Sequence, residues 1–147
     1  MMKLNKTFYP DPVDPVVPAV KLKGHQTDIL AYRNDLETEF SNALAGKFES
    51  AWADDDAFED FTEWVNARFL SIEVYRSQTD PTRMIVEFLI TCGGPHVEII
   101  WDSRWTIAKL THTWGANAHT GEDQTTIDFK GEIIEELIDN LGIERGD

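Results

Sequence analysis

The chain has 147 residues, with 27 acidic residues against 13 Lys and Arg, so its formal net charge is −14. This length and a hydrophobic content of 41% suit one packed domain, and a single cysteine excludes an internal disulfide. The acidic balance argues against direct binding to nucleic acid or to an anionic membrane, and we expect a cytoplasmic protein without a signal peptide or membrane span.

The first 25 residues are predicted to form an extended arm. Proline fixes φ and removes an amide donor, which disfavours regular secondary structure. Four of the six prolines of the chain lie here: Pro10, Pro12, Pro15 and Pro18. We interpret residues 1–25 as a proline-rich arm that is draped over the domain or binds a partner, and residues 26–147 as one domain.

Two helices are predicted next. From Thr27 to Gly46, apolar residues recur every three or four positions, which is typical of an amphipathic helix. The run 54–56 consists of three Asp residues, which are suited to cap a second helix. The apolar face of that helix is expected to contain Phe58, Phe61, Trp64, Val65 and Phe69.

The apolar period changes to two after residue 70, which predicts strands. Four strands are expected, at residues 70–75, 83–92, 97–101 and 105–114, separated by turns. Thr125 or Thr126 is expected to cap a last helix that Gly142 ends. The sequence therefore predicts an α+β fold, in which two N-terminal helices and one C-terminal helix pack on a four-stranded antiparallel meander.

The excess negative charge lies in two short segments. Residues 49–63 hold seven acids and no base, residues 122–147 hold nine acids and two bases, and the remainder is balanced. On a helical projection each segment places five acids on one arc, opposite the apolar residues. These candidate partner-binding residues are Asp55, Asp56, Glu59, Asp60 and Glu63 in the first segment, and Asp128, Glu132, Glu135, Glu136 and Asp139 in the second.

Two interpretations of these acidic arcs remain open. The polar face of any amphipathic helix in an acidic protein is acidic, and this favours solubility. Alternatively, the predicted last helix carries about one charge per ~3–4 Å of axis, close to the ~3.4 Å spacing of phosphates along one DNA strand. Such a face can present itself to a cationic groove as a nucleic-acid mimic does.

No metal, cofactor or catalytic residue is predicted. Zinc sites need closely spaced Cys and His ligands, and the chain has one cysteine and no His pair three to five residues apart. Cys92 and His96 flank a Gly-Gly-Pro turn, but a cysteine at the end of an apolar strand is usually packed in the core.

Three tryptophans, Trp101, Trp105 and Trp114, lie in the last predicted hairpin. We expect two of them in the core and one as an interface anchor, because tryptophan is enriched at protein–protein hot spots.

Three parts of the chain resemble a group of small acidic proteins carried by phages and conjugative elements. The segments are 58–74, 86–97 with its Gly-Gly-Pro turn, and the Trp-Gly step at 114–115 before an acidic last helix. Accessory proteins of this kind include anti-CRISPR and antirestriction proteins. The resemblance implies inhibition of a host defence protein and brings no catalytic residues, and the chain has Cys92 and Glu98 where the group often has aromatic residues.

The leading hypothesis is a non-enzymatic inhibitor that occupies the basic nucleic-acid-binding site of a defence protein, such as a CRISPR or restriction nuclease, through its acidic helices. The alternative is an accessory binding module or homodimer that uses a sheet edge or a tryptophan-rich surface. A third hypothesis, an enzyme using Cys92, His96 or His112, is the least favoured. The protein is expected to be a monomer or a homodimer that needs no cofactor.

Overall fold

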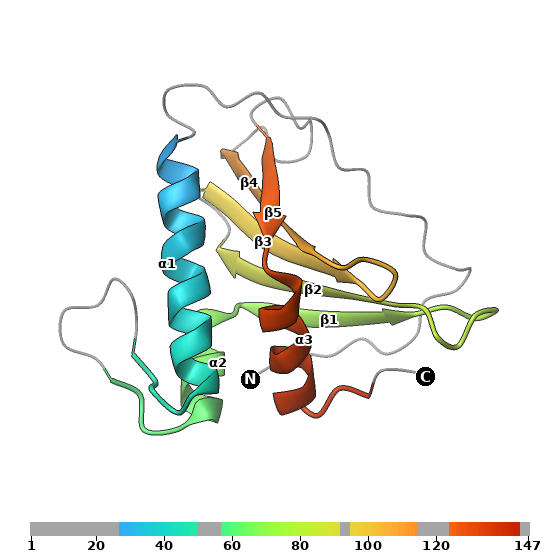
Figure 1. Ribbon diagram of the computed structural model, residues 1–147, viewed down its shortest axis with the longest axis horizontal. Coiled ribbons are helices and arrows are strands. Elements are labelled where there is room, and N and C mark those ends of the chain that lie inside the picture. Colours follow the sequence, from blue (N-terminus) through green and yellow to red (C-terminus); the bar gives the residue numbers. More distant parts are fainter. Residues whose placement is uncertain (1–26, 50–56, 92–94, 115–123, 145–147) are drawn as a thin grey trace.

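The structure, a computed structural model, describes residues 27–49, 57–91, 95–114 and 124–144. The arm predicted at residues 1–25 lies outside the described residues. Figure 1 shows the elements, which are α1 (Thr27–Leu44), α2 (Phe61–Arg68), β1 (Ser71–Arg76), β2 (Met84–Thr91), β3 (Pro95–Asp102), β4 (Ala108–Trp114), β5 (Thr125–Phe129) and α3 (Gly131–Asn140).

The strands form one antiparallel sheet in the order β1-β2-β3-β4-β5, so each strand pairs with its neighbour in sequence. Side chains alternate between the two faces of the sheet. Phe88 lies opposite Ile99, and Ile99 lies opposite Leu110; all three are fully buried on the face that the helices cover. We call this face of the sheet the helix-side face, and the other face of the sheet the opposite face. The α+β class and the antiparallel sheet are confirmed.

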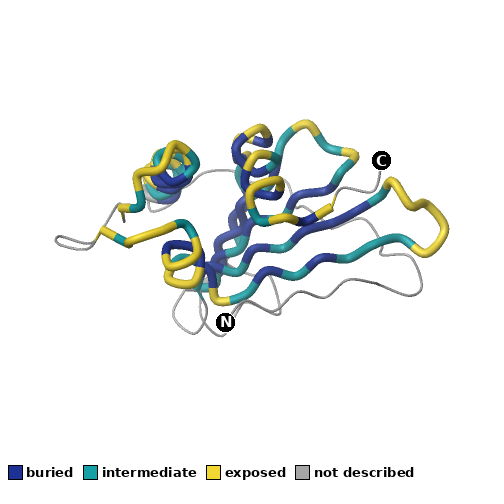
Figure 2. The backbone as a smooth tube through the Cα atoms, turned by 90° about the horizontal axis from the view of Figure 1, so that it is seen from below, coloured by how far each residue is buried: buried dark blue, intermediate teal, exposed yellow. Residues whose placement is uncertain are grey.

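The helices α1 and α3 lie on the same side of the sheet, and α2 lies beside the C-terminal end of α1 (Figures 1 and 2). Phe40 of α1 holds these layers together. Its ring centroid lies 5.5 Å from Trp64 of α2, 5.4 Å from Phe69 and 5.5 Å from Phe129 of β5. Aromatic pairs at this distance add to the stabilisation that comes from burial alone. None of the described helices is long and apolar enough to cross a membrane.

A fifth strand stands where the sequence predicts the start of the last helix. Residues 125–129 form β5, which pairs with β4, and α3 begins only at Gly131. The predicted caps Thr125 and Thr126 are therefore wrong. The reason is Phe129, whose ring packs against Phe40 in the core. In a strand it shares a face with Ile127, and it is 1% exposed.

The second helix also begins later than predicted. Its N-cap is Asp60, whose side chain accepts a hydrogen bond of 2.8 Å from the amide of Glu63. The three Asp residues at 54–56 lie outside the described residues, and Ala57 pairs with Glu49 as an isolated β-bridge. Several acids satisfied the capping preference equally well, so sequence pattern alone did not select the correct one.

A buried ion pair joins α1 to α2. Glu39 has a side chain with no exposed surface, and its two oxygens accept hydrogen bonds from Arg68 at 2.5 and 2.6 Å. The indole N–H of Trp64 donates a third hydrogen bond of 3.0 Å to the same carboxylate. A buried carboxylate is tolerated only when its lone pairs are satisfied in this way.

We predict that Arg68→Met lowers the free energy of unfolding by about 3 kcal/mol, because it leaves the Glu39 carboxylate buried without its cation. Urea denaturation measures this change. Lys47→Met, which removes an exposed cation instead, should change the free energy of unfolding by less than ~0.5 kcal/mol. The double variant Glu39→Met with Arg68→Met should recover part of the free energy of unfolding that Arg68→Met loses. If Arg68→Met lowers this free energy no more than Lys47→Met does, the ion pair is unimportant for stability.

Candidate binding surface

The outer face of α3 carries the largest group of predicted site residues that the structure brings together. Four apolar side chains hold the helix on the core: Ile133, Ile134, Leu137 and Ile138. The outward side carries four acids and no base. We call this set the α3 acidic face; it consists of Glu132, Glu136 and Asp139, which are exposed, and Glu135, which is half-buried.

The charges of the α3 acidic face are closely spaced. From Glu132 to Asp139 the helix axis rises by about 10 Å, so the four charges are spaced about 3.5 Å apart on average, although Glu135 and Glu136 are adjacent in sequence. Glu132 is favoured by the positive end of the helix dipole, whereas Asp139 in the last turn is not, and the last turn of α3 itself contains no basic residue. Helix stability therefore does not explain the whole row.

The acids near α2 form no comparable face. Of the five predicted on one arc, only Glu63 lies within the helix. Asp60 caps the helix, and the Glu63 carboxylate accepts a hydrogen bond of 3.4 Å from the amide of Glu59. Asp55 and Asp56 lie outside the described residues. The predicted five-residue acidic arc is therefore wrong for the described part of this segment, and helix capping explains two of its acids.

Asp128 is also separate from the α3 acidic face. It lies on β5, on the opposite face of the sheet, across from Lys109 of β4. Its carboxylate accepts a hydrogen bond of 2.6 Å from the Lys109 ammonium. The prediction that Asp128 belongs to the acidic arc of the last helix is wrong, because residue 128 belongs to a strand.

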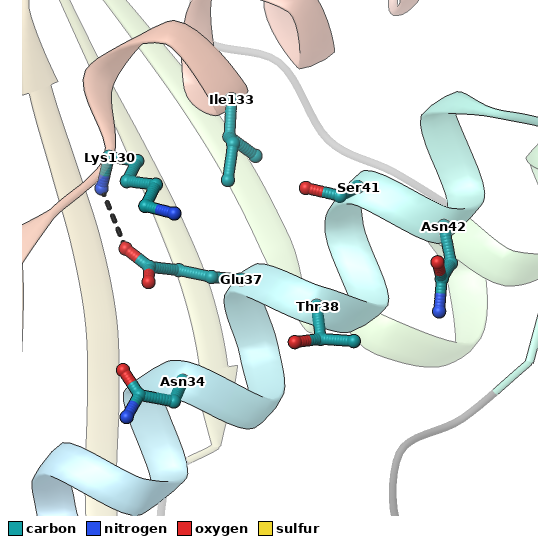
Figure 3. Close-up of a pocket in the computed structure, with 7 residues that line it drawn as sticks. All are labelled: Asn34, Glu37, Thr38, Ser41, Asn42, Lys130 and Ile133. Atoms are coloured by element: carbon teal, nitrogen blue, oxygen red, sulfur yellow. Dashed lines mark hydrogen bonds between the residues drawn. The ribbon is translucent and has the colours of Figure 1, made fainter.

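A groove lies between α1 and the start of α3 (Figure 3). We call it the α1–α3 groove; it has a volume of about 330 Å³ and is lined by Asn34, Glu37, Thr38, Ser41, Asn42, Lys130 and Ile133. Glu37 reaches across from α1 and accepts a hydrogen bond of 2.9 Å from the backbone amide of Lys130. Sequence reasoning missed this groove. Its polar residues at helical spacing were the available signal, but such spacing is common on solvated faces.

The structure separates the histidines considered for catalysis. His112 lies opposite Val97 on the helix-side face, whereas His96 lies opposite Thr113 on the other face. The Nε2 atom of His96 is 3.7 Å from the carboxylate of Glu98. Cys92 lies outside the described residues. Within the described ranges, no group of three or more His, Cys, Asp or Glu is placed to hold a metal ion.

One of the three tryptophans considered for an interface is buried. Trp101 lies on the helix-side face and is 2% exposed, so it is part of the core. Trp105 is half-buried after the β3 strand, and the side chain of Trp114 is outside the described residues. At the β1 edge of the sheet, Leu70 is 58% exposed. The sheet edge is therefore the better-supported part of the alternative interface.

Three carboxylates and a tyrosine gather on the opposite face of the sheet. Glu73 lies directly across from Glu87, and the Tyr75 hydroxyl donates a hydrogen bond of 2.5 Å to Glu73. Burial raises the pKa of the Glu87 carboxyl to about 7, and the charges of Glu98 and Glu73 add to this shift. The pKa of Tyr75 is also raised, chiefly by burial. The sequence did not reveal this cluster, because the cluster depends on strand register.

We predict that the raised pKa of Glu87 makes stability fall as pH rises. The folded state holds this proton up to about pH 7, whereas the unfolded chain releases it near pH 4.5, so the penalty develops between these values. Glu87→Gln should therefore raise the free energy of unfolding at pH 8 by about 1 kcal/mol, a size limited by solvent screening, and change it little at pH 4. Urea denaturation at both pH values measures this.

The exposed Glu49 offers the matched control for that change. Glu49→Gln should leave the pH dependence of the wild-type protein unaltered. Parallel stability profiles for the wild-type protein and Glu87→Gln between pH 4 and pH 8 would contradict the proposed proton uptake.

Comparisons of the chain with protein-family models, with curated proteins and with solved structures find no significant match. The resemblance to phage and conjugative-element proteins therefore stays a prediction.

Proposed function

We propose that the protein is a non-enzymatic inhibitor of a host nucleic-acid-binding defence protein, of the anti-CRISPR or antirestriction type. In this proposal the α3 acidic face occupies a cationic site on the partner. The observation that carries the proposal is this row of four acids, Glu132, Glu135, Glu136 and Asp139, on a helix whose other side is fixed in the core. The type of partner comes from the resemblance.

The support for a mimic of nucleic acid is the spacing of the row. The average charge density of the row, one charge per about 3.5 Å of helix axis, is close to that of one DNA strand, which carries one phosphate per ~3.4 Å. Since α2 contributes no second acidic face in its described part, the row corresponds to one strand and not to a duplex. A cationic groove that binds a single strand, or one wall of a duplex-binding cleft, is the partner surface that fits.

A rigid acidic row has an advantage over a mobile one. The apolar side of α3 is buried, and the amide of Lys130, just before the helix, is held by Glu37 of α1. The charges therefore need little ordering when a partner binds, which reduces the entropic cost of association. Attraction between the row and a basic surface also speeds the encounter and weakens with salt.

A second candidate function is a homodimer or accessory module that pairs through the β1 edge. In the described part of the chain β1 pairs only with β2, and the exposed Leu70 lies beside its outer edge. An open strand edge next to an apolar side chain is a common site of strand addition. Gel filtration distinguishes the two candidates. A dimer that persists at high salt and is lost in Leu70→Lys would support the second candidate.

We predict that Glu132→Lys with Glu136→Lys weakens binding to a basic nuclease at least tenfold and reduces its salt dependence. The two exposed side chains are reversed, so the row loses its negative potential while the buried side of α3 is unchanged. The measurement is calorimetric titration of purified CRISPR and restriction nucleases at low and high salt.

The matched control is Glu49→Lys with Glu59→Lys. It makes the same change in net charge at two exposed positions away from α3, so it isolates the effect of position from that of total charge. Equal weakening by both double variants would show that only overall charge matters. Unchanged inhibition by the α3 variant would contradict the proposal.

A further inference from the structure

The α1–α3 groove lies directly beside the α3 acidic face. Ile133 lines the groove, and it stands next to Glu132 in sequence and one helical turn before Glu136. A partner that covers the acidic row therefore also covers the mouth of the groove. We propose that the groove receives an arginine side chain of the cationic partner; this inference rests on the proposed function.

The groove is lined by acceptor oxygens. Five lining residues come from α1 and carry an amide, hydroxyl or carboxylate group: Asn34, Glu37, Thr38, Ser41 and Asn42. In Figure 3, Glu37 and Ser41 extend toward Lys130 and Ile133, whereas the Asn42 amide points away from them. Within the described residues, the side chains of Thr38, Ser41 and Asn42 make no hydrogen bond to the protein. No described residue therefore competes with an incoming donor for their oxygens.

Arginine fits this lining better than lysine does. A guanidinium carries five N–H donors in a planar fork, whereas an ammonium offers three donors around a point charge. The lining contains one carboxylate, Glu37, and one ammonium, Lys130, so its charges cancel and its remaining polar groups are neutral; such a lining rewards several hydrogen bonds more than charge alone. Arginine is also enriched among residues that dominate interface energies.

Lys130 defines the orientation of the incoming side chain. Its backbone amide donates a hydrogen bond to Oε2 of Glu37, and its side chain lines the same end of the groove, with the ammonium directed into it beside Glu37 (Figure 3). Like charges repel, so the guanidinium enters from the side of Thr38, away from Lys130, and reaches the remaining Glu37 oxygen from there.

The test uses two peptides of equal charge, octa-arginine and octa-lysine, titrated into the full chain at low salt. We expect octa-arginine to bind about fivefold more tightly than octa-lysine, the effect of roughly one additional net hydrogen bond. In Glu37→Gln this preference should fall to about parity, because Gln keeps an acceptor for the Lys130 amide but loses the charge.

Matched controls separate binding in the groove from the general attraction between a cationic peptide and an acidic protein. Asp35→Asn removes an exposed carboxylate from the same helix outside the lining, and it should keep the arginine preference. Thr38→Met, which narrows the groove without changing charge, should abolish the preference, whereas Ala31→Met on the exposed side of α1 should keep it. Circular dichroism verifies that each variant is folded.

The outcomes distinguish the groove from the proposed function. If both peptides bind and every variant keeps the same arginine preference, the groove inference is overturned while the α3 acidic face stands. If neither peptide binds to the wild-type protein at low salt, the electrostatic function itself fails, and the groove inference fails with it. Shifts of the Asn34 and Asn42 side-chain amide resonances on adding octa-arginine, but not octa-lysine, would give independent support.

Discussion

The buried carboxylate of Glu39 is the constraint on which the arrangement of the helices depends. It lies in the interior of the domain, so Arg68 and Trp64 must approach it, and this fixes α2 against α1. Two other residues of α1 fix further elements. Arg33 donates a hydrogen bond to the Asp128 carbonyl of β5, and Glu37 accepts one from the Lys130 amide, just before α3. One helix thus positions α2, the edge of the sheet and α3.

This arrangement changes what the net charge means. Several acids have a partner within the fold: Glu39 pairs with Arg68, Asp128 pairs with Lys109, and Asp60 caps α2. Asp102, which is fully buried, pairs with two arginines. The α3 acidic face differs, because its charges are grouped on one side of a helix without a base among them. This grouping of like charges, and not a lack of partners within the fold, is the reason why we propose a function for it in contact with another protein.

The sequence predicted those features that depend on local pattern. Apolar spacing located α1 and the first four strands, and the strand order followed from short turns. The pattern failed where the same residues were compatible with two structures. The segment before Gly131 was compatible with a helix or a strand, and the burial of Phe129 favours the strand. Several acids before α2 were equally suitable as its N-cap. The α1–α3 groove and the cluster around Glu87 were beyond reach, because both depend on tertiary packing or strand register. Four of the ten predicted site residues form one face, and the helical projection of the sequence did not distinguish them from the other six.

A competition experiment tests the central claim, that the α3 acidic face takes the place of nucleic acid on a partner. Labelled DNA is bound to a basic nuclease that the protein inhibits, and the protein is added at increasing concentration. The account predicts that the apparent Kd of the DNA rises in proportion to the concentration of the protein, and that this effect disappears at high salt. DNA that stays bound with unchanged affinity while the protein occupies the nuclease would contradict it.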